Sequence, residues 1–413
     1  MMTLTTCSAT PSWSVTPDPS LQVNSVAVSA DGNCCIFGTS SEYGDGTFNV
    51  YCYDRAGTLR WQWPFGAAGS TQGVYWVAAS ADGQFAAAGG ETVAQGIGLL
   101  TAYRLSDGAL LLSETPASRI NQVVLSGDGS ALLAVFRDTV KLYSYNGAAY
   151  ICVAQQSFAG ASCNSCALSP DGLRAVVACT FYHDADAGAN AAPSTGQVVS
   201  LEVSARALSI TGIWPTPTGV QRVAVTATGN YWGAVLHDGS CALLGPANVS
   251  QPIWCYRPAM PNLNIAYGID ITETAAGRVV LACAANLTAA KPAPTPPAPA
   301  GYLYLVESVQ DGATQHPNFC WGSELQYSGN PGVSLAREAH SVCATDGQPI
   351  YPLTKPPKET PGNFYLFDGA SGACLWRYAT PIMNWPMALT PDGAQAFGGS
   401  DDGSVYYWGQ TAA

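Results

Sequence analysis

The stretch CNSCALSPDG, at residues 163–172, recurs in altered form along the chain and decides the fold. It reads as a short apolar strand that ends in a tight turn at Asp-Gly. Five other segments match this template, namely VNSVAVSADG (23–32), VYWVAASADG (74–83), INQVVLSGDG (120–129), VQRVAVTATG (220–229) and NWPMALTPDG (384–393). Such an internal repeat predicts a repeated structural unit.

Each template is followed by a second apolar run, so each predicts a hairpin. A further pair of apolar runs then completes a unit of roughly 50 residues. These second pairs are clearest at 47–63, 98–114, 139–155 and 362–378. Four antiparallel strands in each unit are typical of a β-propeller blade.

Two units have lost the regular turn, and we place them at 265–286 and 332–347 with the strands that follow each. The last unit has only three strands. The segment PSWSVTPD (11–18) resembles the outer strands of other units and supplies the fourth. A blade built from both termini closes the ring and removes an exposed strand edge.

The sequence therefore predicts an all-β fold in which residues 1–413 form one eight-bladed β-propeller domain, with four antiparallel strands per blade and the last blade closed by an N-terminal strand. A seven-bladed ring is the alternative if one irregular unit is an insertion. The expected blades are 21–64, 73–115, 119–158, 162–215, 219–258, 263–326, 330–380, and 384–410 with 11–18.

The segments SVAVSADG, VYCYDRAGTLRWQW and FGGSDDGSVYYWG resemble the repeats of WD-repeat and pyrroloquinoline-quinone-like propellers. The family segment that ends in Leu-Trp is fullest at Asp368–Trp376 and partial at Asp54–Trp61. The resemblance implies that Trp61 and Trp376 pack between blades. It implies no activity, because this fold carries enzymes, lectins and scaffolds alike.

The formal net charge of −12 argues against nucleic acid or an anionic membrane as a partner. No apolar stretch is long enough to predict a transmembrane helix. The 14 cysteines favour an extracytoplasmic or secreted protein, although no basic segment of a signal peptide precedes Arg55. Disulfide-bonded and reduced cysteines both remain open, as does the oligomeric state.

In a propeller, the residues that precede the innermost strands ring the mouth of the central channel. Their aromatic faces and amides suit a sugar, an aromatic small molecule or a peptide segment. The alternative is that they only plug or hydrate a structural channel. The candidate residues are Asn24, Tyr75, Trp76, Asn121, Gln122, Asn164, Gln221, Arg222, Tyr267, Asn330 and Trp385.

Three long loops, 181–196, 286–301 and 346–362, are expected on the same face. We therefore expect a propeller that uses the channel mouth and these loops to bind a neutral small molecule, a glycan or a protein segment. The alternative is an enzyme, either a lyase or a quinoprotein-like oxidoreductase, with a dispersed active site at the same mouth.

No metal site and no cofactor are predicted. The four histidines are too few for a multi-histidine site, although His183 and His237 could form a two-histidine site with Asp184, Asp186 or Asp238. Residues 184–190 resemble a calcium loop without its terminal acidic ligand. Calcium or a quinone remains an alternative. The pair Cys34-Cys35 is similar to the vicinal disulfide over the quinone in the family's dehydrogenases, but it follows a turn away from the channel mouth.

The opening stretch also contains a Cys-x-x-Cys, at Cys163 and Cys166. Sibling segments have apolar residues at both positions, and the redox chemistry of such a pair needs a helix that lowers the thiol pKa. We therefore expect two buried thiols that face opposite sides of an extended strand.

Overall fold

The computed structural model describes residues 10–67, 70–93, 97–182, 194–204, 206–246, 250–288, 299–329, 332–348 and 359–409. The regular secondary structure in these ranges is β-strand, and none of their residues is helical. Accordingly, the described chain contains no helix of the length and hydropathy needed to cross a membrane.

The strands follow one another in groups of four. The first groups are β2 (Gln22–Val28), β3 (Cys34–Gly46), β4 (Asn49–Asp54), β5 (Leu59–Pro64); β6 (Ser70–Ala79), β7 (Phe85–Val93), β8 (Ile97–Arg104), β9 (Leu110–Glu114); β10 (Gln122–Leu125), β11 (Ala131–Phe136), β12 (Thr139–Tyr145), β13 (Tyr150–Ser157). The next are β14 (Ser162–Leu168), β15 (Arg174–Phe181), β16 (Thr195–Ser204), β17 (Ala207–Thr216); β18 (Val220–Val225), β19 (Trp232–Leu236), β20 (Cys241–Leu244), β21 (Trp254–Tyr256). The last are β22 (Leu263–Glu273), β23 (Val279–Leu287), β24 (Gly301–Asp311), β25 (Thr314–Leu325); β26 (Ser334–Leu335), β27 (Ser341–Asp346), β28 (Gly362–Asp368), β29 (Cys374–Thr380); β30 (Asn384–Leu389), β31 (Ala396–Ser400), β32 (Val405–Trp408), with β1 (Trp13–Val15).

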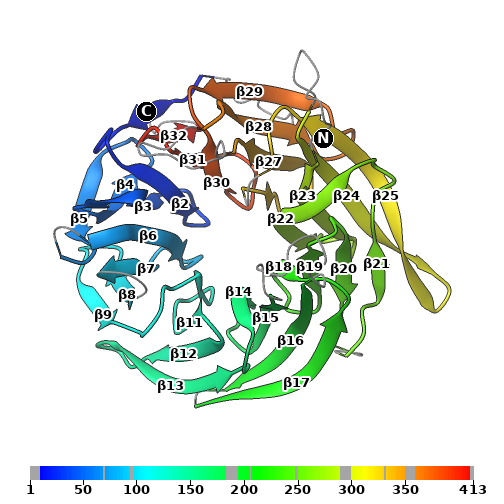
Figure 1. Ribbon diagram of the computed structural model, residues 1–413, viewed down its shortest axis with the longest axis horizontal. Coiled ribbons are helices and arrows are strands. Elements are labelled where there is room, and N and C mark those ends of the chain that lie inside the picture. The colour runs from blue at the N-terminus through cyan, green and yellow to red at the C-terminus, as the bar shows by residue number, and fades with distance from the viewer. Residues whose placement is uncertain are drawn as a thin grey trace.

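Six of these groups are separate four-stranded antiparallel sheets, whereas β2 to β9 form one eight-stranded sheet. Figure 1 shows the sheets following one another around a central opening, with β5, β9, β13, β17, β25 and β29 on the rim. Strands β2, β14, β18, β22 and β30 lie towards the centre. The arrangement is consistent with a β-propeller.

The eight-stranded sheet differs from the expectation of one separate sheet per unit. Strand β3 pairs with β2 only as far as Ser40, and beyond that residue its free edge pairs with the start of β6, from Ser40↔Gly73 to Gly46↔Ser70. The backbone groups of an unpaired strand edge are a template for another strand. The two units are therefore joined by the extension of β3, which the repeat pattern does not reveal.

The N-terminal strand completes the last group, as predicted. Strand β1 pairs antiparallel with β32, from Trp13↔Tyr407 to Val15↔Val405. The indole of Trp13 also stacks on the ring of Tyr407, with centroids 5.0 Å apart and planes 9° from parallel. The edge of β32 is thus covered by residues from the other end of the chain.

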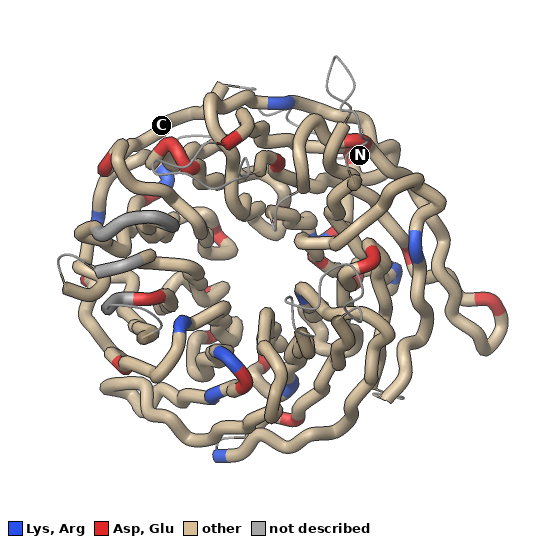
Figure 2. The backbone as a smooth tube through the Cα atoms, viewed as in Figure 1, with Lys and Arg blue, Asp and Glu red and all other residues tan. Residues whose placement is uncertain are grey.

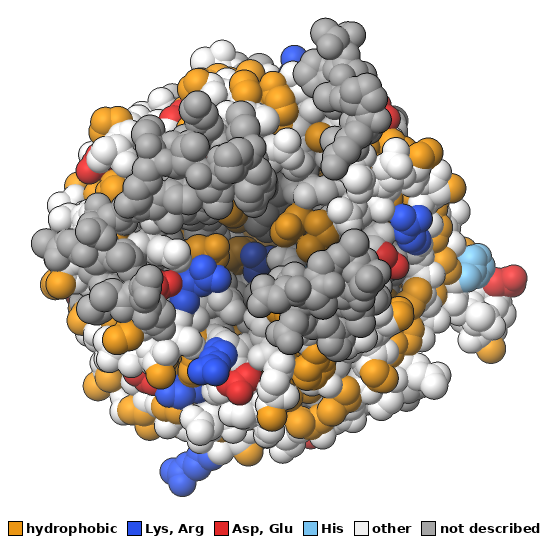
Figure 3. Space-filling view, in the orientation of Figure 1, with side chains coloured by type: hydrophobic (Ala, Val, Ile, Leu, Met, Phe, Trp, Pro, Cys, Tyr) orange, Lys and Arg blue, Asp and Glu red, His pale blue; other side chains and the backbone are white. Residues whose placement is uncertain are grey.

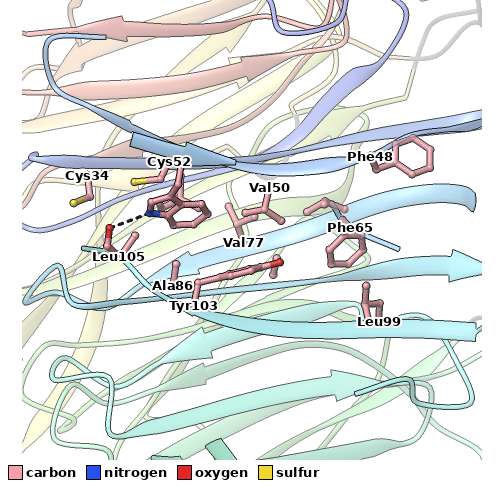
Figure 4. Close-up of a cluster of buried hydrophobic side chains, with 14 of the residues drawn as sticks. Cys34, Phe48, Val50, Cys52, Phe65, Val77, Ala86, Leu99, Tyr103 and Leu105 are labelled. Carbon is pink, nitrogen blue, oxygen red and sulfur yellow. Dashed lines mark hydrogen bonds between the residues drawn. The ribbon is translucent and has the colours of Figure 1, made fainter. Parts of the chain in front are cut away.

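Hydrophobic clusters fill the spaces between neighbouring sheets. Figure 4 shows the cluster between β2–β5 and β6–β9, which includes Val77 and Tyr103. Trp61 belongs to the same cluster, and its ring lies 5.3 Å from that of Tyr103. The indole Nε1 of Trp61 donates to the carbonyl oxygen of Leu105 in the next unit, at 3.0 Å. Trp376 likewise stacks on Trp408 of the next unit, with centroids 5.0 Å apart. Both tryptophans therefore pack between units, as the family resemblance implies.

The contact made by Trp61 recurs around the ring. Trp13 donates to the carbonyl of Arg55 at 2.9 Å, and Trp321 donates to that of Gly369 at 2.8 Å. Each of the three rings packs on a turn glycine of the next unit, at which a Cβ would lie 3.0 Å or closer to the ring. These glycines are Gly57, Gly108 and Gly372.

The Asp-Gly turns of the template are closed by one side-chain motif. In the opening stretch, Ser169 Oγ donates to Asp171 at 2.5 Å and accepts the N–H of Arg174 at 3.0 Å. The same pair occurs in four other templates, as Ser29 with Asp31, Ser80 with Asp82, Ser126 with Asp128, and Thr390 with Asp392. The turns predicted from the repeat are therefore confirmed.

Candidate functional site

The inner strands enclose a central cavity of about 380 Å³. Val, Ala and Leu side chains of β2, β6, β10, β14, β18 and β30 line most of it, together with Trp76, Gln122 and Asp270. Figure 3 shows the hollow at the centre of one face, with basic and apolar side chains inside it. Acidic and basic residues are otherwise scattered around the ring (Figure 2).

Six of the eight inner strands, all except β10 and β26, have a β-bulge or register shift near the residues that line the cavity. On β6 the pairing passes from Val74↔Gly90 to Trp76↔Gly89, so Tyr75 is an extra residue. Bulges re-aim side chains and are frequent at functional sites. The candidate residues that fall in such irregularities are Asn24, Tyr75, Asn164, Gln221, Tyr267 and Trp385.

The bulge at Asn164 overturns the expectation that Cys163 and Cys166 face opposite sides. Cys163 pairs with Cys179 and Cys166 with Val177, two residues apart on β15. Both thiols therefore lie on the same face and in one hydrophobic cluster. Their burial is confirmed, and the Sγ atom within reach of Cys163 is that of Cys179, at 3.7 Å. All thirteen cysteines in the described part of the chain are free thiols.

The centre of the site is a contact between Arg222 and Trp76. The guanidinium carbon of Arg222, from β18, lies 4.5 Å from the centre of the Trp76 ring, from β6. Its Nη1 donates to Gln122 Oε1 at 3.2 Å and to the carbonyl oxygen of Asn164 at 3.3 Å. One guanidinium thus joins four inner strands and four of the residues predicted from the sequence.

Trp76 and Arg222 depart from the usual role of their template position. In sibling strands this position accepts a backbone N–H of the next inner strand, as Ser25 does from Val77 at 2.9 Å and Ser165 from Val223 at 3.2 Å. Trp76 and Arg222 instead stack on each other. A departure from a repeated structural rule is expected at functional positions.

Arg222 is a desolvated cation. Burial lowers the pKa of its guanidinium to about 10, opposed by the tyrosines at 75, 182 and 267, so it stays charged at neutral pH. Its Nε is buried without a hydrogen-bond partner, and Nη2 donates to none of the described residues. The ion pairs in the described ranges do not include Arg222.

A second guanidinium lies over the aromatic side chain of the residue that precedes Trp76. Arg119 stacks over Tyr75, 4.2 Å from the ring centre, and donates to Asn121 Oδ1 at 3.4 Å and to Gln72 Oε1 at 3.3 Å. Sequence reasoning missed Arg119, which stands one residue before its template. A basic residue directly before a predicted mouth residue was the available signal.

Asn164 and Gln221 join the site through Tyr182 and His237. Asn164 Nδ2 lies 3.0 Å from Thr180 Oγ1 and 3.3 Å from Tyr182 Oη. The Tyr182 ring is 6.1 Å from that of His237, whose Nε2 is 3.1 Å from Gln221 Oε1. Burial lowers the pKa of His237, so its imidazole is neutral at neutral pH.

Two candidate residues stand apart from this group. Among the described residues, Asn24 on β2 and Trp385 on β30 form no hydrogen bond or ring stack with Arg222 or Trp76. Asn24 Oδ1 and Trp385 Nε1 are nevertheless buried without a hydrogen-bond partner in the described ranges. They offer one acceptor and one donor on adjoining units.

Asp270 is a cavity residue that sequence reasoning did not select. Its carboxylate oxygens accept the N–H groups of Ile271 at 2.8 Å and Leu335 at 2.7 Å. Burial raises its pKa from 3.8 to about 6. The available signal was an isolated acid inside the apolar run IAYGIDIT (265–272).

Several expectations fall outside the described residues. These are Asn330, His183, the calcium-like segment 184–190, and most of the three long loops, at 183–193, 289–298 and 349–358. Among the residues that are described, no three His, Cys, Asp or Glu side chains come together to hold a metal ion.

Comparison with known proteins finds no protein family and no curated protein that matches this chain.

Proposed function

We propose that the protein is an eight-bladed β-propeller that binds a small ligand at the mouth of its central channel. The blade count follows if β2–β5 and β6–β9 are two blades joined by the β3–β6 pairing, beside six separate four-stranded sheets. The blades then correspond to the eight repeat units of one domain. This scaffold positions the residues of several blades around one opening.

The observation that carries the proposal is the stack of Arg222 on Trp76. Structural channel residues need only join neighbouring blades, as Ser25 and Ser165 do. Arg222 and Trp76 do not accept a backbone N–H as these serines do, and instead stack on each other across the inner strands. This stack creates a flat aromatic surface beside hydrogen-bond donors, which suits recognition of a ligand.

The surroundings support a small and partly aromatic or sugar-like ligand. The cavity volume of about 380 Å³ is within the range of small-molecule sites. Tyr75 and Trp76 offer ring faces, and Asn24 and Trp385 offer unpaired polar atoms. A neutral small molecule, a glycan and a protein segment each have matching groups.

The alternative function is an enzyme, and the raised pKa of Asp270 favours it. A carboxyl with a pKa near neutrality is typical of general acid-base catalysts. Both oxygens of Asp270, however, accept backbone N–H groups, one of them from the next inner strand at Leu335. This arrangement joins neighbouring blades, so we place binding before a lyase or oxidoreductase activity.

A fragment screen by ligand-observed NMR tests the proposal. Fragments that bind the wild type are expected to lose binding to Trp76→Ala and Trp385→Ala, while the melting temperature changes little. Trp63→Ala is the matched control, because Trp63 is 40% exposed on the outer strand β5. Equal binding to Trp76→Ala and Trp63→Ala would contradict binding at the mouth.

A further inference from the structure

The planar guanidinium of Arg222 has one edge that forms hydrogen bonds and one edge that forms none with the described residues. Its Nη1 already donates to Gln122 and to the carbonyl of Asn164. The N–H groups of Nε and Nη2 lie on the other side of the planar guanidinium and point the same way. Neither has a partner in the described part of the chain, and Nε is buried. This edge is the one that matches the two oxygens of a carboxylate.

The environment holds that edge in a fixed orientation. The ring of Trp76 supports the guanidinium from one face at 4.5 Å, and the two bonds from Nη1 set its rotation. An unpaired donor on a buried charged group is unfavourable in the folded protein. A ligand oxygen that reaches Nε therefore relieves a cost that the free protein carries.

Among the described residues, no carboxylate pairs with Arg222 or Arg119, and Asp270, which lines the cavity, accepts two backbone N–H groups. The ion pairs in the described ranges join Arg104 to Asp107, Lys141 to Glu114, and Arg278 to Glu307. Arg222 and Arg119 therefore present positive charge without a carboxylate partner of their own, although acidic residues outnumber basic ones, 28 to 16.

We propose that the ligand is a small organic acid whose carboxylate binds the Nε–Nη2 edge of Arg222. This inference rests on the proposed function and defines the ligand class. Arg119, stacked on the adjacent Tyr75, adds a second positive charge. The rest of the acid lies along the aromatic and amide side chains of the mouth.

A single carboxylate fits better than a polyanion. The formal net charge of −12 repels multiply charged anions at a distance. The Nε and Nη2 donors of Arg222 match one planar carboxylate, with two parallel N–H···O bonds. The neutral amide of the same acid can accept only one of these bonds, which provides a matched pair of probes.

Benzoate and benzamide are such a pair, and isothermal titration with each tests the inference. The wild type is expected to bind benzoate at least about tenfold more tightly than benzamide. Arg222→Met should remove this preference, because benzoate then loses both N–H···O bonds and benzamide loses only one. Arg222→Lys should keep part of the preference for benzoate, because lysine retains the positive charge without the two parallel N–H donors. Arg377→Met is the control, because Arg377 is exposed on the outer strand β29.

The outcomes separate this inference from the proposed function. Equal binding of benzoate and benzamide by the wild type overturns the carboxylate assignment and leaves a mouth that binds neutral ligands. A preference for benzoate that survives in both Arg222 variants, each shown to be folded by circular dichroism, also overturns it. Binding of neither probe overturns it as well, and the fragment screen with Trp76→Ala then decides separately on the mouth as a binding site.

Discussion

The guanidinium of Arg222 and the indole of Trp76 are stacked 4.5 Å apart, although β18 and β6 are separated in the ring by β10 and β14. The contact passes over Gln122 and the backbone of Asn164, which accept hydrogen bonds from the same guanidinium. It therefore bridges four inner strands beside the central cavity.

Replacement of Arg222 by Met should not destabilise the protein. A buried cation costs desolvation energy, and an apolar side chain of similar length can pack on Trp76 without that cost. The free energy of unfolding from urea denaturation is expected to stay within about 1 kcal/mol of the wild type, or to rise. A loss of more than about 3 kcal/mol would show that Arg222 mainly holds the blades together.

Asp270 should make stability depend on pH. Its pKa is raised from 3.8 to about 6, so the folded state binds its proton more tightly than the unfolded state. The resulting stabilisation is present below the unfolded pKa and is lost as the pH rises through about 6. Between about pH 8 and pH 5, the wild type should gain about 1 kcal/mol relative to Asp270→Asn.

Denaturation of both proteins at several pH values measures this difference. The comparison removes the contribution of the other acidic groups, which titrate in both proteins. Parallel stability curves for the wild type and Asp270→Asn would mean that Asp270 titrates normally in the folded state.

The packing of Trp61 on Gly108 should be visible in a pair of glycine variants. Gly108 has φ +72°, and a Cβ there would lie 2.8 Å from Cγ of Trp61. Gly147 has φ +92° with no atom near its Cβ position. Gly147→Ala should cost about 1 kcal/mol through backbone strain alone, and Gly108→Ala at least about 2 kcal/mol. Equal costs would show that the tryptophan moves aside freely.

Closure of the ring depends on Trp13. Trp13→Ala loses the stack on Tyr407 and the bond to the carbonyl of Arg55, and it weakens the cover over the edge of β32. We expect a loss of about 2 kcal/mol or more in unfolding free energy, with more aggregation on heating. Trp63→Ala should stay within about 1 kcal/mol of the wild type, because its ring is exposed. Similar melting and light scattering for the two variants would argue against this closure.

The repeat pattern predicted the features that depend on local alternation of apolar residues. These include the strand groups, the Asp-Gly turns and the N-terminal strand. The bulge at Asn164 was not predictable, because it depends on which N–H groups of β14 pair with β15. The error about Cys163 and Cys166 follows directly from it.

Several residues of the candidate site were selected from the sequence, but their contacts with one another were not predicted. Trp76, Gln122, Asn164 and Arg222 were all selected, because each stands near the start of an inner strand. Their meeting around one guanidinium requires the curvature of the ring, which joins residues far apart in the sequence. Arg119 was missed because it lies outside the template, and Asp270 because burial, which the sequence does not specify, raises its pKa.

The most direct test of the account is to locate a bound acid in a crystal. Crystals soaked in 4-bromobenzoate would reveal the bromine by its anomalous scattering. The account predicts a bromine peak at the channel mouth, with the carboxylate on the Nε–Nη2 edge of Arg222 and the ring beside Trp76. A peak only on the outer surface, or the same mouth peak in crystals of Arg222→Met, would contradict it.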